Sequence, residues 1–394
     1  MHTDILHRYA SHHLCKSVCI CVRIISIRKT KHPFINDFRD FSYVQKNSYL
    51  CALNPKTMRS FGSDNHSGVH PAILEAIAAC NADHEIAYGD DTYTARVREL
   101  FKTQFGETAE VFPVFNGTGA NVVAQRACVR SFNSILCAET AHIAVDECGA
   151  PAFMTGASLV SIPTPDGKLT PQLIEPHLTN WGFEHHSQPK SVYISQCSEL
   201  GTVYTCEEIR AIADFIHPFG MYLHLDGARI ANAAVKLGKS FKEMTTDCGV
   251  DIVSFGGTKN GMLMGESVVV LNPALVSELK YHRKQCAQLS SKMRYLSAQF
   301  IAYFENDLWR KNAAHANAQA QKLRQRITEL RGDIFTQSTD CNILLLRLPR
   351  PVADRLAKTT FFYYWNEADD EIRLVTSWDT TDEDIERVME ALKG

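Results

Sequence analysis

Short apolar runs alternate with stretches of helical spacing through most of the chain after residue 70. Residues 71–81 begin with a proline and place three apolar side chains on one helix face, which predicts a helix. A run at 111–115 predicts a strand, and 120–129 predicts the helix that follows it. Further strands, with helices such as 207–215 and 231–237 between them, are predicted at 135–138, 159–162, 192–195, 222–225, 252–255 and 268–271.

Strands that alternate with helices indicate an α/β fold, because parallel strands need a long crossover connection. The strand runs are almost wholly apolar, which favours a mainly parallel sheet covered by helices on both faces. We therefore predict a large domain of this kind at 58–272. After Pro273 a long helical stretch, apolar runs at 342–348 and 371–377 and a last helix predict a smaller α+β domain at 273–394.

Residues 1–57 differ from the rest of the chain in charge. They carry 9 of the 41 Lys and Arg residues but only 3 of the 44 Asp and Glu, together with four of the thirteen Cys. We predict a basic extension that is disordered or not native, with Met58 as the true start. A transit peptide is the alternative, because the segment is basic and poor in acidic residues. A zinc site is disfavoured, since the cysteine spacing matches no strong zinc pattern.

Composition excludes several classes of protein. Hydrophobic residues make up 45 % of the chain and charged residues 22 %, which are globular proportions. The formal net charge of −3 lacks the basic excess of a nucleic-acid binder. The sequence has no run of about 20 apolar residues, the length that a membrane span requires. The odd number of cysteines argues against a disulfide framework, so we expect buried free thiols and a cytoplasmic protein.

Three polar clusters follow predicted strands, at the sheet edge where ligands bind in α/β folds. The first is NGTGAN at 116–121. Its glycines and helix N-terminus suit a phosphate group, although an ordinary N-cap loop is the alternative. The second is HLDGAR at 224–229. Its Asp226 follows a buried strand and needs a partner, while Arg229 offers a fork of donors to a carboxylate.

The third cluster is SFGGTKNG at 254–261, in which Lys259 lies between glycines at the end of an apolar strand. A partly desolvated amine has a lowered pKa and forms Schiff bases, whereas a solvated loop lysine is the alternative. Together with Asp226 and the loop at 116–121, this lysine fits the requirements of pyridoxal phosphate. The lysine forms the imine, the acid partners the pyridine nitrogen and the loop holds the phosphate.

These residues make the sequence similar to the L-threonine aldolase family, within the β-eliminating lyases of the type I fold of pyridoxal-phosphate enzymes. The similar stretches keep the family's order and spacing from about residue 58 to the end of the chain. The residues around Lys259 most resemble the low-specificity and phenylserine aldolases. The stretches are FGSDN (61–65), YGDD (88–91), GT (117–118), AH (141–142), HLDGAR (224–229), the lysine loop and EIRLVT (371–376).

The resemblance implies a role for each matching residue. Lys259 would bind the cofactor covalently, and Asp226 would keep its pyridine nitrogen protonated. His142 would stack on the ring, where a satisfied polar residue at a strand end is the alternative. Gly117 and Thr118 would bind the phosphate.

The substrate carboxylate would be bound by Ser63, Arg229 and Arg373. A solvated charge at a strand edge is the alternative for Arg373. Arg294 matches a position that reaches a neighbouring subunit's cofactor, which implies a homo-oligomer, either a dimer or a tetramer.

The chain departs from the family at QCSE (196–199), where many members have Glu-Asn-Thr-His, and at Thr258, where many have serine. The first departure changes the residues that make the family's polar contact to the cofactor or substrate, so the resemblance does not assign that contact here. The second keeps the hydroxyl.

The implied activity is that of a carbon–carbon lyase, a low-specificity L-threonine aldolase. It would cleave L-threonine, L-allo-threonine or related substrates such as phenylserine to glycine and an aldehyde, with His142 or a bound water as the base for the β-hydroxyl. Another type I lyase or an aminotransferase would use the same Lys259 and Asp226 and remains an alternative. A non-catalytic binding protein on this fold is the third possibility, against which the intact lysine, aspartate and two arginines argue.

Overall fold

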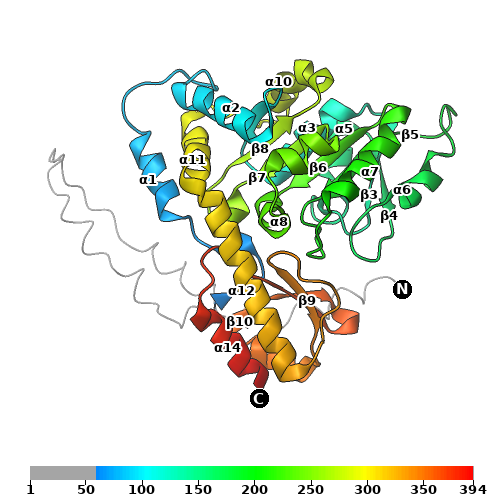
Figure 1. The fold of residues 1–394 in the computed structure, drawn as a ribbon. Coiled ribbons are helices and arrows are strands. Elements are labelled where there is room, and N and C mark those ends of the chain that lie inside the picture. Colours follow the sequence, from blue (N-terminus) through cyan, green and yellow to red (C-terminus); the bar gives the residue numbers. More distant parts are fainter. Residues whose placement is uncertain (1–58, 394) are drawn as a thin grey trace, which may run out of the picture. The chain divides into compact units, whose positions relative to one another are not determined.

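A seven-stranded sheet forms the centre of the larger part of the molecule in a computed structural model that describes residues 59–393 (Figure 1). Its strand order is β2-β8-β7-β6-β5-β3-β4, and every neighbouring pair is parallel except the two that involve β8. The predicted α/β fold with a mainly parallel sheet is confirmed. The strands are β2 (Glu110–Val114), β3 (Asn133–Ala138), β4 (Ser158–Ile162), β5 (Gln188–Ser195), β6 (Tyr222–Gly227), β7 (Ile252–Gly256) and β8 (Glu266–Val270).

Both faces of this sheet are covered. In β6 the His224 side chain meets Gln125 of the helix α3 (Gly117–Cys128), with 2.8 Å between Nδ1 and Nε2. Leu223 and Leu225 point to the opposite face, because side chains alternate along a strand, and both are fully buried. The other helices of this part are α1 (Pro71–Ala79), α2 (Thr92–Phe105), α4 (His142–Val145), α5 (Ala150–Thr155), α6 (Pro171–Ile174), α7 (Cys206–Ile216), α8 (Ile230–Leu237) and α9 (Phe241–Met244).

Polar caps set where several helices begin. The Asn116 side chain accepts a hydrogen bond from the Gly119 N–H at 2.7 Å, so α3 begins at Gly117, three residues before the predicted start. The Asp91 carboxylate caps α2 in the same way, through the Thr94 N–H at 2.7 Å. These caps satisfy N–H groups that have no partner inside the helix.

The long helical stretch predicted after Pro273 is three separate helices, α10 (Val276–Gln285), α11 (Arg294–Phe304) and α12 (Leu308–Arg331). Left-handed backbone at Ala287, Asn306 and Asp307 interrupts it. Because apolar spacing continues through both turns, the sequence pattern did not reveal these breaks. α10 packs against α3, and α11 packs against α1 and α2. The boundary between the two domains at 272/273 stays a prediction.

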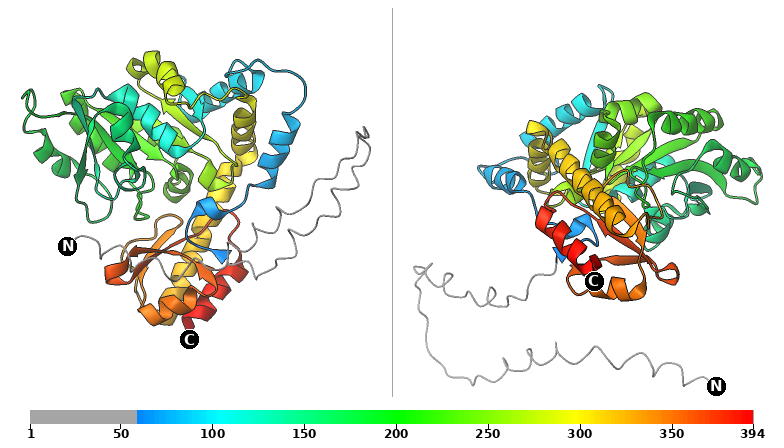
Figure 2. Two further views of the ribbon diagram at one scale, coloured as in Figure 1. Left: turned by 180° about the vertical axis from the view of Figure 1, so that it is seen from behind. Right: turned by 60° about the horizontal axis from the view of Figure 1, so that its bottom comes forward.

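A smaller antiparallel sheet, β11-β12-β9, has a hydrophobic core of its own. The helix α12 contributes to both cores, since Trp309 packs in the first and Leu323 in the second. Figure 2 shows this helix from two more directions, with α14 beside its C-terminal half. The remaining elements are β1 (Arg59–Ser60), which pairs with β10 (Thr360–Phe361), and β9 (Ile343–Arg347), α13 (Arg350–Leu356), β11 (Tyr363–Asn366), β12 (Glu371–Val375) and α14 (Asp382–Lys393).

Within residues 59–393, no helix has both the length and the hydropathy to cross a membrane. All nine cysteines of this part are free thiols. Seven are buried as expected, but Cys148 is exposed and Cys286 half-buried. The predicted extension at 1–57, its alternatives and the start at Met58 lie outside the described residues.

Candidate active site

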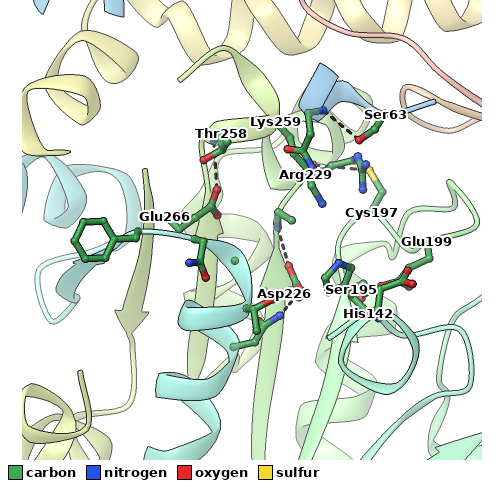
Figure 3. A pocket seen from close by; sticks show the side chains of 18 of the residues that line it. Ser63, His142, Ser195, Cys197, Glu199, Asp226, Arg229, Thr258, Lys259 and Glu266 are labelled. Atoms are coloured by element: carbon green, nitrogen blue, oxygen red, sulfur yellow. Dashed lines mark hydrogen bonds between the residues drawn. The ribbon is translucent and has the colours of Figure 1, made fainter. Parts of the chain in front are cut away.

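A cavity of about 340 Å³ opens at the carboxyl ends of β5, β6 and β7 (Figure 3). Eight of the nine predicted site residues line it, although they come from positions as far apart as 63 and 373. The exception is Arg294, at the start of α11, whose guanidinium donates to the carbonyls of Ala82 and Asp83 at 3.0 Å. The eight lining residues are Ser63, Gly117, Thr118, His142, Asp226, Arg229, Lys259 and Arg373.

Asp226, the penultimate residue of β6, accepts more hydrogen bonds than any other carboxylate that lines the cavity. Its Oδ2 accepts hydrogen bonds from Asn121 at 2.9 Å and from the Tyr193 hydroxyl, and its Oδ1 accepts from the Ala228 N–H at 2.9 Å. Burial alone would raise its pKa, but these hydrogen bonds and the nearby Lys259 charge outweigh burial and lower the pKa. Asp226 therefore stays ionised at neutral pH.

Lys259 follows β7 in a single 3-10 turn, η7 (Thr258–Asn260), between Gly257 and Gly261. Burial lowers the pKa of its ammonium, and the positive charge of Arg229 lowers it further. Among residues 59–393 the Lys259 ammonium has no hydrogen-bond or ion-pair partner. An amine with a lowered pKa is neutral more often than a surface lysine, which makes it a better nucleophile.

The start of α3 provides a binding surface for an anion. Gly117 and Thr118 line the cavity, and their N–H groups lie in the first turn, where the helix supplies no acceptor. Gln288 holds the loop before them by accepting from the Phe115 N–H at 3.0 Å. Free N–H groups and the positive end of the helix dipole together favour a phosphate group.

Arg229 is held by a carboxylate that sequence reasoning did not pair with it. Its Nε and Nη2 donate to Asp64 Oδ2 at 2.7 Å and Oδ1 at 2.9 Å, and Asn342 donates to the same carboxylate at 3.0 Å. Asp64 is 1 % exposed. The fork thus leaves one guanidinium nitrogen, Nη1, for a ligand. Asp64 is a positioning residue for Arg229.

Replacing Asp64 by alanine should lower the free energy of unfolding by about 3–5 kcal/mol, because it leaves a buried guanidinium unpaired. Urea denaturation of the two proteins measures this difference. The matched control is Glu386→Ala, which removes the exposed ion pair with Arg326 and should change stability little. Equal effects of the two substitutions would contradict a structural role for the buried pair.

Arg373 reaches the cavity from the smaller sheet, where it lies in β12. Its Nη2 donates to the Gly62 carbonyl at 3.5 Å, and its Nε is buried and has no partner among the described residues. Arg373 in β12 and Arg229, which precedes α8 just after β6, therefore bring two guanidinium groups to one cavity. Such a pair suits a carboxylate ligand.

His142 forms a pair with a buried acid, Glu147, which is only 4 % exposed. The distance between His142 Nδ1 and Glu147 Oε1 is 2.7 Å, and this hydrogen bond raises the pKa of the imidazole. The Asn121 amide donates to the same Glu147 oxygen at 2.7 Å as well as to Asp226. The amide thereby connects the histidine–glutamate pair to the carboxylate of β6.

Comparison with models of known protein families identifies the family of this chain. The model of the β-eliminating lyases matches residues 60–348, which is well over half of the sequence. The chain belongs to the β-eliminating lyase family.

Similar proteins cover nearly the whole of the described part. The low specificity L-threonine aldolase of Pseudomonas aeruginosa is 40 % identical over 333 residues, which is 84 % of this chain and 95 % of that protein. The low specificity L-threonine aldolase of a Pseudomonas species is 39 % identical and covers 82 % and 93 %. The structure of Leishmania major threonine aldolase superposes with a TM-score of 0.80 at 30 % identity, over 85 % and 98 % of the two chains.

More distant structures share the fold alone. An aromatic aminotransferase from Pyrococcus horikoshii has a TM-score of 0.63 at 15 % identity and covers 87 % of this chain and 96 % of its own. The same fold therefore occurs in proteins with different names and reactions. The reaction of this chain has to be inferred from the residues of its cavity.

Two acids in the cavity of this β-eliminating lyase escaped the sequence analysis. Glu266 begins β8 and is 5 % exposed, and burial raises its pKa to about 7. Glu199 follows β5 in the QCSE segment. The only signal for Glu266 was an acid two residues before the apolar run predicted at 268–271. The only signal for Glu199 was that the QCSE segment departs from the family pattern, and that departure did not indicate which residues Glu199 would contact.

Proposed function

We propose that this β-eliminating lyase binds pyridoxal 5′-phosphate and cleaves β-hydroxy-α-amino acids to glycine and an aldehyde. L-Threonine, L-allo-threonine and phenylserine are the candidate substrates. The observation that carries the proposal is a cavity that combines an ionised aspartate, two arginines and a lysine with no partner among the described residues. The names of the two Pseudomonas relatives support the same reaction.

The residues present fit the cofactor at each of its groups. Lys259 would bind its aldehyde carbon, Asp226 its pyridine nitrogen, and the first turn of α3 at Gly117 and Thr118 its phosphate. His142 would cover one face of the ring. When bound, the cofactor supplies a conjugated ring that accepts electrons from the bond that breaks. The Asp226 carboxylate, kept ionised by three donors, favours a protonated pyridine nitrogen and thereby strengthens that electron withdrawal.

The amino acid substrate would be oriented by its carboxylate. Arg373, the free Nη1 of Arg229 and the Ser63 hydroxyl all line the cavity and offer donors to it. Holding the carboxylate fixes the rotation about the Cα–N bond and so selects which bond to Cα is cleaved. We also infer a cytoplasmic homo-oligomer, in which Arg294 would contact the cofactor of a neighbouring subunit.

A substrate panel tests the proposed function. The purified protein, supplied with pyridoxal phosphate, should release glycine and acetaldehyde from L-threonine and L-allo-threonine, and glycine and benzaldehyde from phenylserine. Visible absorbance should show that the cofactor is bound. Amino-group transfer to a keto acid without aldehyde release would identify an aminotransferase instead, and absence of bound cofactor would identify a non-catalytic protein.

A further inference from the structure

Glu199 is a carboxylate of the cavity with no part in the proposed binding of cofactor or substrate carboxylate. Its Oε1 accepts hydrogen bonds from the His142 N–H at 2.9 Å and from the Ser195 hydroxyl at 2.7 Å. Figure 3 shows Glu199 beside these two residues, on the side of the cavity where His142 lies. The two donors hold the carboxylate in one orientation.

The second oxygen of the Glu199 carboxylate, Oε2, is buried and accepts no hydrogen bond from the residues that the structure describes. An unsatisfied buried acceptor costs about 1–3 kcal/mol, more when it is charged, so a donor supplied by a ligand would be stabilising. The β-hydroxyl of the proposed substrates is such a donor, and its proton has to leave during cleavage.

Charged residues of the same cavity interact with the Glu199 carboxylate. Burial raises the pKa of Glu199 above its usual value, and the Asp226 charge raises it further, against the effect of the hydrogen bonds from Ser195 and His142. Burial lowers the pKa of the Arg373 guanidinium, and the negative charge of Glu199 is among those that oppose this shift. A carboxylate whose pKa lies closer to neutral accepts a proton more readily than an ordinary one.

The other acceptors of the cavity are less suited to the β-hydroxyl. Asp226 is occupied by three donors and would face the pyridine nitrogen. His142 has its pKa raised by Glu147, so at neutral pH it carries a proton more often than a free histidine. Glu266 accepts from the Thr258 N–H at 3.3 Å, next to the lysine.

We propose that Glu199 Oε2 accepts the proton of the substrate's β-hydroxyl, a role that rests on the proposed function. The O–H electrons then form the C=O bond of the aldehyde, and the Cα–Cβ bond breaks. Its electron pair stays on Cα, stabilised by the electron withdrawal that the cofactor would supply when bound. A proton from solvent then reaches Cα to give glycine, and Glu199 releases the proton it accepted to solvent, which restores the carboxylate. This assignment replaces His142 or water as the base.

Glu199→Gln tests the proposal, because glutamine keeps the shape and an oxygen for the contacts of Oε1 but accepts no proton. We expect kcat for cleavage of L-threonine to fall by about 100-fold or more. Exchange of the glycine Cα hydrogen in heavy water, followed by NMR, uses the same site without a β-hydroxyl and should stay close to the wild-type rate. The affinity for glycine, measured by titrating the cofactor absorbance, should also be retained.

Two further variants sharpen the test. Glu199→Asp keeps the charge and should restore part of the cleavage rate. The matched control is Glu139→Gln, which changes an exposed glutamate outside the cavity and should leave both reactions unchanged.

Two results would overturn the proposal: cleavage by Glu199→Gln at the wild-type rate, or an equal fall of cleavage and glycine exchange. The second would assign a structural role, and a lowered melting temperature would accompany it. Failure of the wild-type protein to bind pyridoxal phosphate or to cleave any β-hydroxy amino acid would refute the proposed function, and the role of Glu199 with it.

Discussion

Replacing Lys259 by alanine should abolish cleavage of every β-hydroxy amino acid and remove the visible absorbance of lysine-bound cofactor. No other lysine lines the cavity, so within residues 59–393 no second amine is placed to take over. The fold should survive, because burial disfavours the unpaired ammonium that the substitution removes. Aldehyde release and the absorbance spectrum measure the effect, and circular dichroism checks the fold.

A surface lysine provides the control for this experiment. Lys242 lies on α9 and pairs with Asp247 away from the cavity, so Lys242→Ala should keep both the activity and the yellow colour. An active, yellow Lys259→Ala protein would refute the assignment of the lysine.

Replacing Asp226 by asparagine should lower kcat by more than about 100-fold. Breaking a buried charge pair costs about 3–5 kcal/mol, and each 1.4 kcal/mol is a factor of ten in rate. Asparagine has a similar shape but no charge, so the pyridine nitrogen of the bound cofactor would lose the proton that makes the ring withdraw electrons. Steady-state kinetics with L-threonine measure the loss.

The cofactor spectrum shows whether the loss in Asp226→Asn arises at the ring. Its absorbance should change with pH at a lower pH than in the wild-type protein, because the pyridine nitrogen would titrate more easily. Asp247→Asn, an exposed aspartate paired with Lys242, is the control and should behave as wild type. An Asp226→Asn protein with normal kcat would show that this carboxylate has only a structural role.

Local patterns predicted most of the elements around the site. The apolar run at 252–255 became β7, and Lys259 follows it as the glycine-rich loop indicated. Asp226 likewise stands at the end of β6, where a carboxylate needs partners. Such predictions succeed because strand periodicity and turn residues act over a few positions.

The partners of these residues could not be predicted in the same way. Asp64 holds Arg229 from 165 positions away, and Asn121 bridges Asp226 and Glu147. Glu199 is placed against His142, 57 positions earlier in the chain. Each pairing depends on which strands lie side by side, and the order β7-β6-β5-β3 is set by packing of whole elements.

The sequence by itself determined the fold class and the family, because strand periodicity and short motifs act over a few positions. It also predicted eight of the residues that line the cavity, and their roles toward the cofactor stay a prediction. The tertiary structure decided which of their atoms are free. Two nitrogens of Arg229 bind Asp64, and among residues 59–393 neither Lys259 nor the Oε2 of Glu199 has a hydrogen-bond partner. The physical reason is that hydrogen bonds and burial between distant segments exist only once the sheets and helices have packed.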